Sequence, residues 1–131
     1  MGIGGVFFKF NDPTKMKDWY KNVLGMTTND YGVLFTFNTP NTKPAYLQLG
    51  TFESNSEYFG SESQKAMINF RVDNMEMLVK KLKANNVSIL NEIEDYDYGR
   101  FLHISDPEGN RIELWEPIDV AFSEEPKTVM F

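Results

Sequence analysis

His103 is the only histidine in the chain, and Glu113 follows it after an intervening turn sequence. The turn residues 106–110 read Asp-Pro-Glu-Gly-Asn. Proline presets φ, glycine allows a positive φ, and Asp and Asn side chains bond their own backbone, so this segment predicts a tight turn. Apolar and polar residues alternate on both sides of it, which predicts two antiparallel strands within 99–117.

The register of this hairpin decides which side chains share a face. If Ile104 lies opposite Ile112, then His103 lies opposite Glu113 on the other face, together with aromatic residues. Such a face predicts a small-molecule site, and in an enzyme Glu113 and His103 would be the catalytic pair that moves protons. A surface hairpin whose polar face meets water is the alternative interpretation.

Length and composition limit the class of protein. A chain of 131 residues predicts one domain with a real hydrophobic core. The hydrophobic share of 41% and the aromatic share of 15% exclude a disordered chain. The net charge of −6 makes nucleic acid and anionic membrane surfaces poor partners, so we expect neither.

The chain has no cysteine, which excludes disulfides, thiolate catalysis and cysteine-based metal sites. This composition is compatible with a reducing cytoplasm, where we expect the protein to act. The first residues lack the charged start and apolar run of a signal peptide, and no stretch approaches the roughly 18 apolar residues of a membrane span. A single histidine also excludes a multi-histidine metal site within one chain.

The first half of the chain predicts a strand, a capped helix and short strands. Asp12 is a good N-cap, Pro13 suits the first helical position, and Gly25 is expected just after the helix. The apolar stripe of this helix is Met16, Trp19, Tyr20, Val23 and Leu24. The expected strands are 5–10, 26–29, 33–37 and 45–49.

The second half predicts the same order of elements. A strand over 66–72 precedes a helix that Asp73 and Asn74 cap, and a strand over 87–90 leads through a connection, 91–98, to the hairpin. Between the halves, residues 51–65 are expected to form a mobile connection. Its aromatic residues Tyr58 and Phe59 are expected to anchor it to the core, with a lid over a pocket as the alternative.

These similarities amount to an internal repeat. The segment Gly5–Asp12 aligns with Met67–Asn74, and 47–49 aligns with 112–114. The alignment gives equivalent positions to four residues: Gly5, Gln48, Met67 and Glu113. If the two halves curve into one cup with the helices outside, these four positions converge.

Residues 5–13, Trp19-Tyr20, Leu24-Gly25 and 106–117 together resemble the vicinal oxygen chelate superfamily of glyoxalase I, bleomycin resistance proteins and extradiol dioxygenases. The resemblance covers roughly residues 3–117. It implies an α+β fold in which two βαβββ modules with curved mixed sheets form a cup, and it implies a homodimer. The expected organisation is one domain over 1–131, with module one at about 3–50, the connection at 51–65, module two at about 66–117 and a tail at 118–131.

The resemblance also implies where a metal would bind. Metal-dependent members place His, Gln or Glu at the four equivalent positions. Gly5 has no side chain and Met67 offers a thioether, so only Gln48 and Glu113 have suitable oxygens. We therefore expect no metal cofactor, with a divalent metal at Gln48 and Glu113, or with His103 as a third ligand, as the alternative.

The sequence and the resemblance leave three alternative functions. The first is metal-free binding of a small organic molecule, with Arg71 holding an anionic group or pairing with Glu113, and Glu113 holding an amine. The second is a lyase, isomerase or dioxygenase that uses Glu113 as base or metal ligand. The third is an interaction module that has lost its ligand. The residues expected to line the cup are Phe7, Tyr46, Gln48, Asn69, Arg71, Phe101, His103, Glu113 and Trp115.

Overall fold

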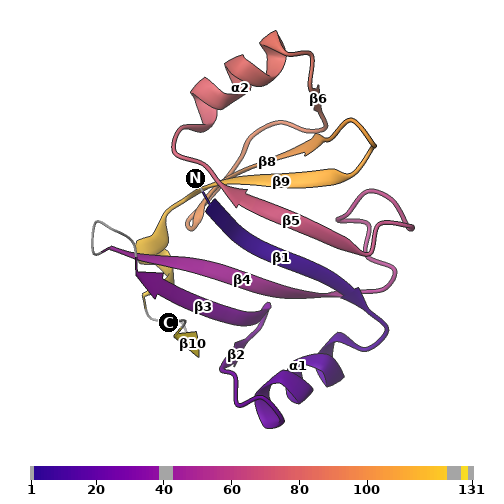
Figure 1. The fold of residues 1–131 in the computed structure, drawn as a ribbon, viewed down its shortest axis with the longest axis vertical. Helices are drawn as coiled ribbons and strands as arrows, with labels where there is room; N and C mark the ends of the chain where they lie inside the picture. Colours follow the sequence, from indigo (N-terminus) through magenta and orange to yellow (C-terminus); the bar gives the residue numbers. More distant parts are fainter. Residues whose placement is uncertain (1, 39–42, 124–127, 130–131) are drawn as a thin grey trace.

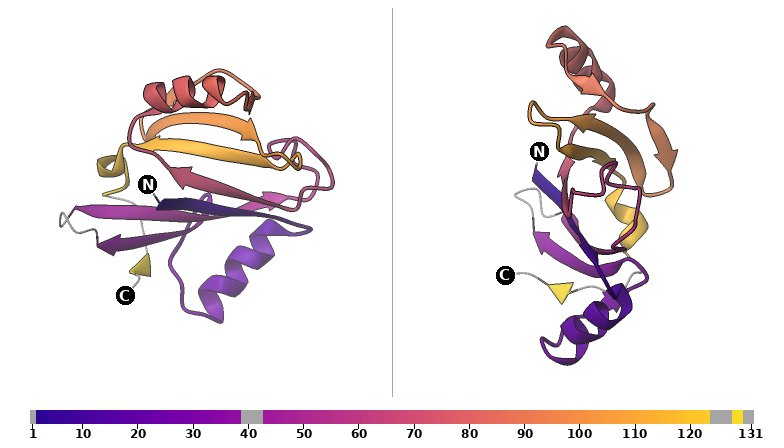
Figure 2. Two further views of the ribbon diagram at one scale, coloured as in Figure 1. Left: turned by 45° about the horizontal axis from the view of Figure 1, so that its top comes forward. Right: turned by 90° about the vertical axis from the view of Figure 1, so that its right-hand side faces the viewer.

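The fold is one curved mixed sheet with a helix outside it at each end (Figure 1 and Figure 2). The computed structural model describes residues 2–38, 43–123 and 128–129. Within them the strand order is β10-β3-β4-β1-β5-β9-β8-β6, with β2 paired to β3 and β7 paired to β8. No helix in these ranges is long and apolar enough to cross a membrane.

The elements follow the order that the sequence predicts. The first module contains β1 (Gly2–Phe10), α1 (Pro13–Asn22), β2 (Thr28–Asn29), β3 (Gly32–Asn38) and β4 (Pro44–Glu53). The second contains β5 (Ala66–Arg71), α2 (Met75–Ala84), β6 (Ser88–Ile89), β7 (Glu94–Tyr96), β8 (Gly99–Ser105) and β9 (Arg111–Pro117). After them come the short 3-10 helix η1 (Asp119–Phe122) and β10 (Thr128–Val129).

Several boundaries differ from the prediction. β1 begins at Gly2 instead of residue 5, and α1 ends at Asn22, before Val23 and Leu24 of the expected stripe. The two connections differ as well. β4 continues to Glu53, so the part of the connection outside the sheet is 54–65. The expected connection 91–98 contains β7, which pairs with the start of β8. β7 escaped prediction because it is short and exposed throughout, and therefore lacks an apolar face.

The two modules join where β1 pairs antiparallel with β5. In this register Gly5 lies opposite Asn69, and Phe7 lies opposite Met67. In the repeat, Gly5 is equivalent to Met67 and Phe7 is equivalent to Asn69. Each of these two cross-strand pairs is therefore the counterpart of the other. The sequence repeat is therefore also a repeat in space. In each module the first strand pairs in parallel with the last, β1 with β4 and β5 with β9.

A second repeat marks the start of β3 and β8. The tripeptide Asp-Tyr-Gly occurs at 30–32 and again at 97–99. Gly32 has φ 137° and Gly99 has φ 139°, a region that only glycine occupies without strain. These two glycines turn the chain in the same way in both modules.

The two helices are held differently. Both have the predicted cap, because Asp12 accepts a hydrogen bond from the Lys15 backbone and Asn74 accepts one from the Met77 backbone. α2 packs on module two around the fully buried Met75, in a cluster with Val72, Leu102, Ile104 and Leu114. Of the ten residues of α1, none is buried.

The hairpin of β8 and β9 has the predicted register and turn. Ile104 lies opposite Ile112, and His103 lies opposite Glu113. Asp106 accepts hydrogen bonds from the backbone of Glu108 and from the backbone and side chain of Asn110. These bonds lower the pKa of Asp106 because they favour its carboxylate.

Candidate functional site

Glu113 is the centre of the site. It is 1% exposed, although it carries a carboxyl group. Asn69 Nδ2 donates to its Oε1 at 2.7 Å, and His103 Nε2 lies 2.7 Å from its Oε2. The Tyr58 hydroxyl also donates to Oε2. Three donors around one buried carboxyl group satisfy most of its hydrogen-bonding capacity and fix its orientation.

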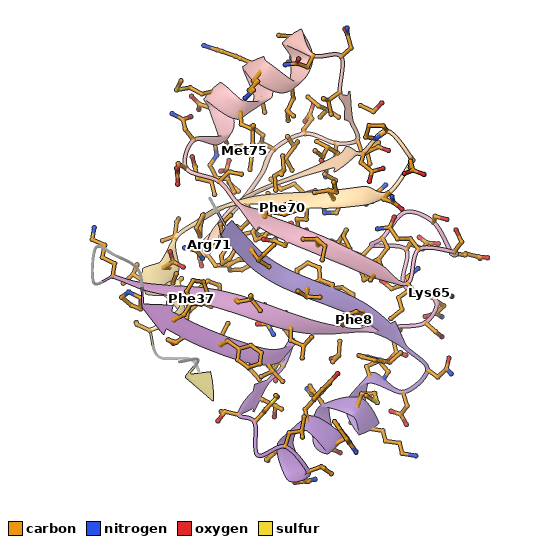
Figure 3. All side chains as sticks on the ribbon, viewed as in Figure 1. Phe8, Phe37, Lys65, Phe70, Arg71 and Met75 are labelled. Atoms are coloured by element: carbon orange, nitrogen blue, oxygen red, sulfur yellow. The ribbon has the colours of Figure 1, made fainter. Side chains whose placement is uncertain are left out.

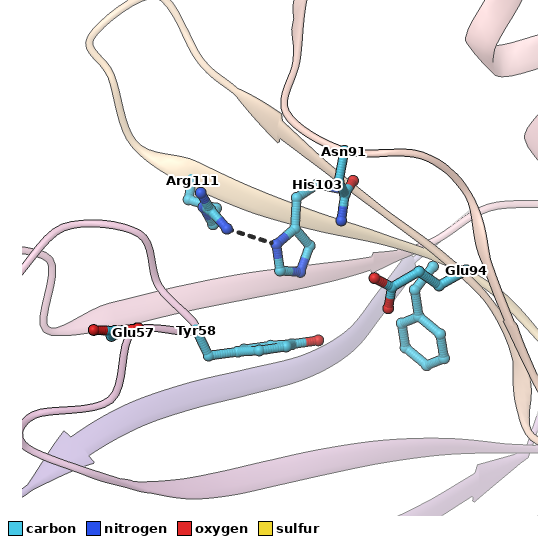
Figure 4. A pocket seen from close by; sticks show the side chains of 7 residues that line it. Glu57, Tyr58, Asn91, Glu94, His103 and Arg111 are labelled. Carbon is cyan, nitrogen blue, oxygen red and sulfur yellow. Dashed lines mark hydrogen bonds between the residues drawn. The ribbon is translucent and has the colours of Figure 1, made fainter.

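The partners of His103 decide which ring nitrogen carries the proton. Arg111 Nη1 lies 3.1 Å from His103 Nδ1 (Figure 4). A guanidinium only donates hydrogen bonds, so Nδ1 is the acceptor and the proton lies on Nε2. The imidazole is therefore neutral in this arrangement and donates to Glu113. The result is a chain of hydrogen bonds from Arg111 through His103 to Glu113.

Tyr58 reaches the site from the connection between the modules. Its ring stacks on Phe52 with centroids 5.6 Å apart and meets His103 edge-on at 4.9 Å. Burial of the hydroxyl, followed by the Glu113 carboxylate, raises the pKa of Tyr58, so the hydroxyl remains a donor. Tyr58 as a whole is 42% exposed, and its side chain covers Glu113 in the manner of a lid.

Phe59 anchors the same segment. Its side chain is fully buried in a cluster with Phe7 and Met67, against which Phe52 also packs. The anchor expected for this connection is therefore Phe59. Tyr58, its neighbour, takes the covering position that the sequence analysis considered as the alternative.

A cavity of about 390 Å³ opens above Glu113. Nine aromatic residues line it: Phe7, Tyr31, Phe52, Tyr58, Tyr96, Tyr98, Phe101, Trp115 and Phe122. The polar side chains in the lining are Asp30, Gln48, Thr51, Asn69 and Glu113. Among the described residues that line it, none is Lys or Arg. The cavity is thus an apolar, aromatic space with acceptor groups.

A second, more polar hollow of about 350 Å³ adjoins the cavity (Figure 4). It shares Tyr58 and Phe101 with the first. Its other lining residues are Glu57, Asn91, Glu94, His103 and Arg111. Figure 4 shows the Tyr58 ring across the hollow from His103 and Arg111. His103 therefore stands between the hollow and Glu113.

Six of the residues predicted for the cup line the cavity: Phe7, Gln48, Asn69, Phe101, Glu113 and Trp115. His103 lines the adjoining hollow instead. Tyr46 and Arg71 line neither. Tyr46 is buried with its ring 5.5 Å from that of Phe122, and the backbone carbonyl of Tyr46 accepts from Arg71 Nη1 at 3.1 Å.

Arg71 has a different partner from the one considered from sequence. It forms an ion pair with Asp119 of η1, and its guanidinium lies 5.3 Å from the Trp115 ring centroid. The pairing of Arg71 with Glu113 is therefore wrong. Arg71 fixes η1 against the sheet and does not line the cavity.

The four positions of the family's metal site do not form a chelate here. Met67 is 1% exposed among apolar rings, and a Cβ on Gly5 would lie 2.6 Å from the Phe7 ring. Gln48 Nε2 donates to the backbone carbonyls of Val33 and Leu49. Within the described ranges, no group of three or more His, Cys, Asp and Glu side chains is placed to hold a metal ion. These residues do not fit the family's metal.

Ten of the sixteen lining residues were not among those predicted for the cup, although Tyr58 was considered as part of a lid. The ten are Gly4, Asp30, Tyr31, Gly50, Thr51, Phe52, Tyr58, Tyr96, Tyr98 and Phe122. The repeated Asp-Tyr-Gly tripeptide was a usable signal for Tyr31 and Tyr98, because equivalent positions of the two modules face one cup. Tyr58 and Phe122 come from segments outside the repeat, and no pattern in the sequence places them.

The curved α+β sheet with a cup on its concave side defines a known class of fold. The chain belongs to the Glyoxalase/Bleomycin resistance protein/Dioxygenase superfamily, whose family model matches residues 3–114. No curated protein sequence matches the chain.

Solved structures have the same fold. The methylmalonyl-CoA epimerase of Streptomyces coelicolor is 14% identical with a TM-score of 0.66, covering 90% of this chain and 98% of that one. The methylmalonyl-CoA epimerase of Mycobacterium tuberculosis is 19% identical with a TM-score of 0.60, covering 92% and 90%. A Legionella pneumophila structure described as an NAD-dependent benzaldehyde dehydrogenase is 20% identical with a TM-score of 0.55, covering 86% and 97%. At these identities the likeness concerns the fold alone.

Proposed function

We propose that this protein binds a small organic molecule in the aromatic cavity without using a metal ion. The single observation that carries the proposal is a cavity of about 390 Å³ with nine aromatic residues around a buried carboxyl group. Aromatic side chains offer flat apolar surface, and a few fixed polar groups orient a ligand. The mismatch at Gly5 and Met67 supports binding that does not depend on the family's metal.

A ligand screen tests this proposal. We expect an aromatic ligand, present at a free concentration of a hundred times its Kd, to stabilise the protein by about 2.7 kcal/mol. This stabilisation is measured as a rise in Tm. Replacing Trp115 by leucine removes one wall of the cavity and is expected to abolish the shift. Trp19→Leu is the matched control, because Trp19 lies exposed on α1. A stoichiometric metal in the purified protein, needed for binding, would contradict the metal-free part of the proposal.

The hydrogen-bonded chain favours a second candidate, an isomerase or lyase in which Glu113 accepts a proton from a carbon acid. His103 accepts a hydrogen bond from Arg111 and donates one to Glu113, which holds the carboxylate in a fixed orientation for accepting the proton. We expect Glu113→Gln to abolish such a turnover while binding of the ligand persists. Turnover that survives this substitution would remove Glu113 as the base.

We also propose that two copies associate through the outer face of module one. Val33, Leu49, Val6 and Ile68 form an apolar row across four strands, and only Val33 is fully buried. Other half-buried apolar residues on these strands are Phe8, Phe35, Phe37 and Leu47. Figure 3 labels Phe8 and Phe37 among them. A second copy would cover this apolar surface without burying a charge from the row.

Sedimentation or light scattering tests the association. We expect the wild type to be a dimer and Leu47→Glu to be a monomer, since the new carboxylate has no partner in an apolar interface. Lys80→Glu on α2 is the control and is expected to stay dimeric. A monomeric wild type would contradict the proposal.

A further inference from the structure

Among the described residues, the cavity lining contains carboxylates and no Lys or Arg. Glu113 lies at its floor and Asp30 lies exposed at its edge. Arg71, which was predicted to line the cup, forms an ion pair with Asp119, and neither residue lines the cavity. An anionic ligand would meet no opposite charge among the described lining residues, whereas a cationic ligand would meet two.

Asn69 supplies an independent observation. Its Nδ2 donates to Glu113, which fixes the orientation of the amide, and its Oδ1 has no hydrogen-bond partner within the described residues. Asn69 is 2% exposed. A buried acceptor without a partner is costly and calls for a donor that is absent from the protein itself.

The unpartnered oxygen lies against Gly4, which lines the cavity together with Asn69. A Cβ at Gly4 would approach it to 2.4 Å, so glycine is needed for the backbone to pass beside it. Glu113, next to Asn69, has about four acceptor sites and uses three of them. Two neighbouring acceptors are thus open to a ligand with hydrogen-bond donors.

The aromatic residues that line the cavity also favour a cationic ligand. Phe101 and Trp115 stack with centroids 5.9 Å apart, and Tyr96 stacks on Tyr98 at 5.4 Å. The faces of aromatic rings attract cations, and they pack against flat apolar groups. We propose that the ligand is an organic cation, a protonated amine on an aromatic or apolar body, with its ammonium directed at Asn69 Oδ1 and Glu113. This inference rests on the proposed binding function and names its ligand class.

Three matched probes test the ligand class: 2-phenylethylamine, 2-phenylethanol and 3-phenylpropanoate, which are cationic, neutral and anionic at neutral pH. Trp115 reports on the cavity, and Trp19→Phe removes the only other tryptophan. Fluorescence titration of this single-tryptophan protein then measures binding directly. We expect the amine to bind about tenfold tighter than the alcohol, since charge-assisted hydrogen bonds are stronger than neutral ones, and the acid to bind weakest.

Substitutions show which residue causes the preference for the amine over the alcohol. Glu113→Gln keeps the shape of the side chain and is expected to abolish the preference for the amine over the alcohol, whereas Glu108→Gln in the exposed hairpin turn is expected to keep it. If Glu113→Gln does not fold, Asp30→Asn at its exposed position serves instead, with an expected two- to threefold loss of the preference.

The outcomes separate the two proposals. Equal binding of the three probes, or tighter binding of the acid, overturns the cationic ligand and leaves small-molecule binding intact. No binding of any probe by the folded protein contradicts the proposed binding function, and the cationic ligand with it.

Discussion

Replacing Phe59 by alanine is expected to lower the free energy of unfolding by about 3–5 kcal/mol, the range for a large aromatic side chain removed from a core. Phe59 is fully buried beside Phe7 and Met67, and Phe52 packs against this cluster. Phe7, Phe52 and Met67 come from β1, β4 and β5, so the cavity left by the substitution lies where the two modules join. Urea denaturation followed by circular dichroism measures the loss.

Tyr58→Phe is the companion variant, because it removes only the hydroxyl that donates to Glu113. We expect it to cost about 1 kcal/mol, since one hydrogen bond is lost and the ring keeps its contacts. A loss below about 1 kcal/mol for Phe59→Ala would show that this side chain does not anchor the connection.

Alanine at Gly32 or Gly99 is the second substitution with a large expected effect. A Cβ at Gly32 would lie 2.1 Å from the Leu49 carbonyl oxygen, and one at Gly99 would lie 2.4 Å from that of Glu116. Both contacts are with backbone, so no side-chain rotation relieves them. The strained φ alone costs about 1–3 kcal/mol, and the clash adds to it by forcing the paired strands apart.

Gly109→Ala is the matched control for this pair. Gly109 also has a positive φ, 86°, but a Cβ there meets nothing within 4 Å. We expect it to cost about 1–2 kcal/mol, the conformational penalty alone. Thermal or chemical unfolding of the three variants measures the difference. Equal losses at Gly32 and Gly109 would show that backbone strain, and not the close contact with β4, makes glycine necessary.

The sequence predicts the fold well where local chemistry and periodicity agree. Asp12 and Asn74 cap the two helices as expected, and the turn at 106–110 sets the register that places His103 opposite Glu113. These features depend on residues close together in the chain, or on strands joined by a tight turn, where spacing alone decides which side chains share a face.

The rest of the site depends on contacts between distant segments. Tyr58 meets Glu113 because its neighbour Phe59 is anchored against Phe7 and Met67, and Arg71 pairs with Asp119 because η1 lies beside the cup. A side chain that reaches the site from a segment without alternation leaves no periodic signal. Tyr46 was predicted to line the cup, but its ring packs against Phe122 of η1 instead. The sequence pattern did not indicate this contact between distant segments.

The connection 54–65 exists once, whereas α1, α2 and most strands around the cup have a counterpart in the other module. Two equal modules alone would present a ligand with two similar walls. Tyr58 breaks that equivalence, because it covers Glu113 and has no counterpart across the junction of β1 and β5. After a duplication, such a single-copy segment is free to diverge without disturbing strand register. We therefore expect selection for a new ligand to act first on this connection.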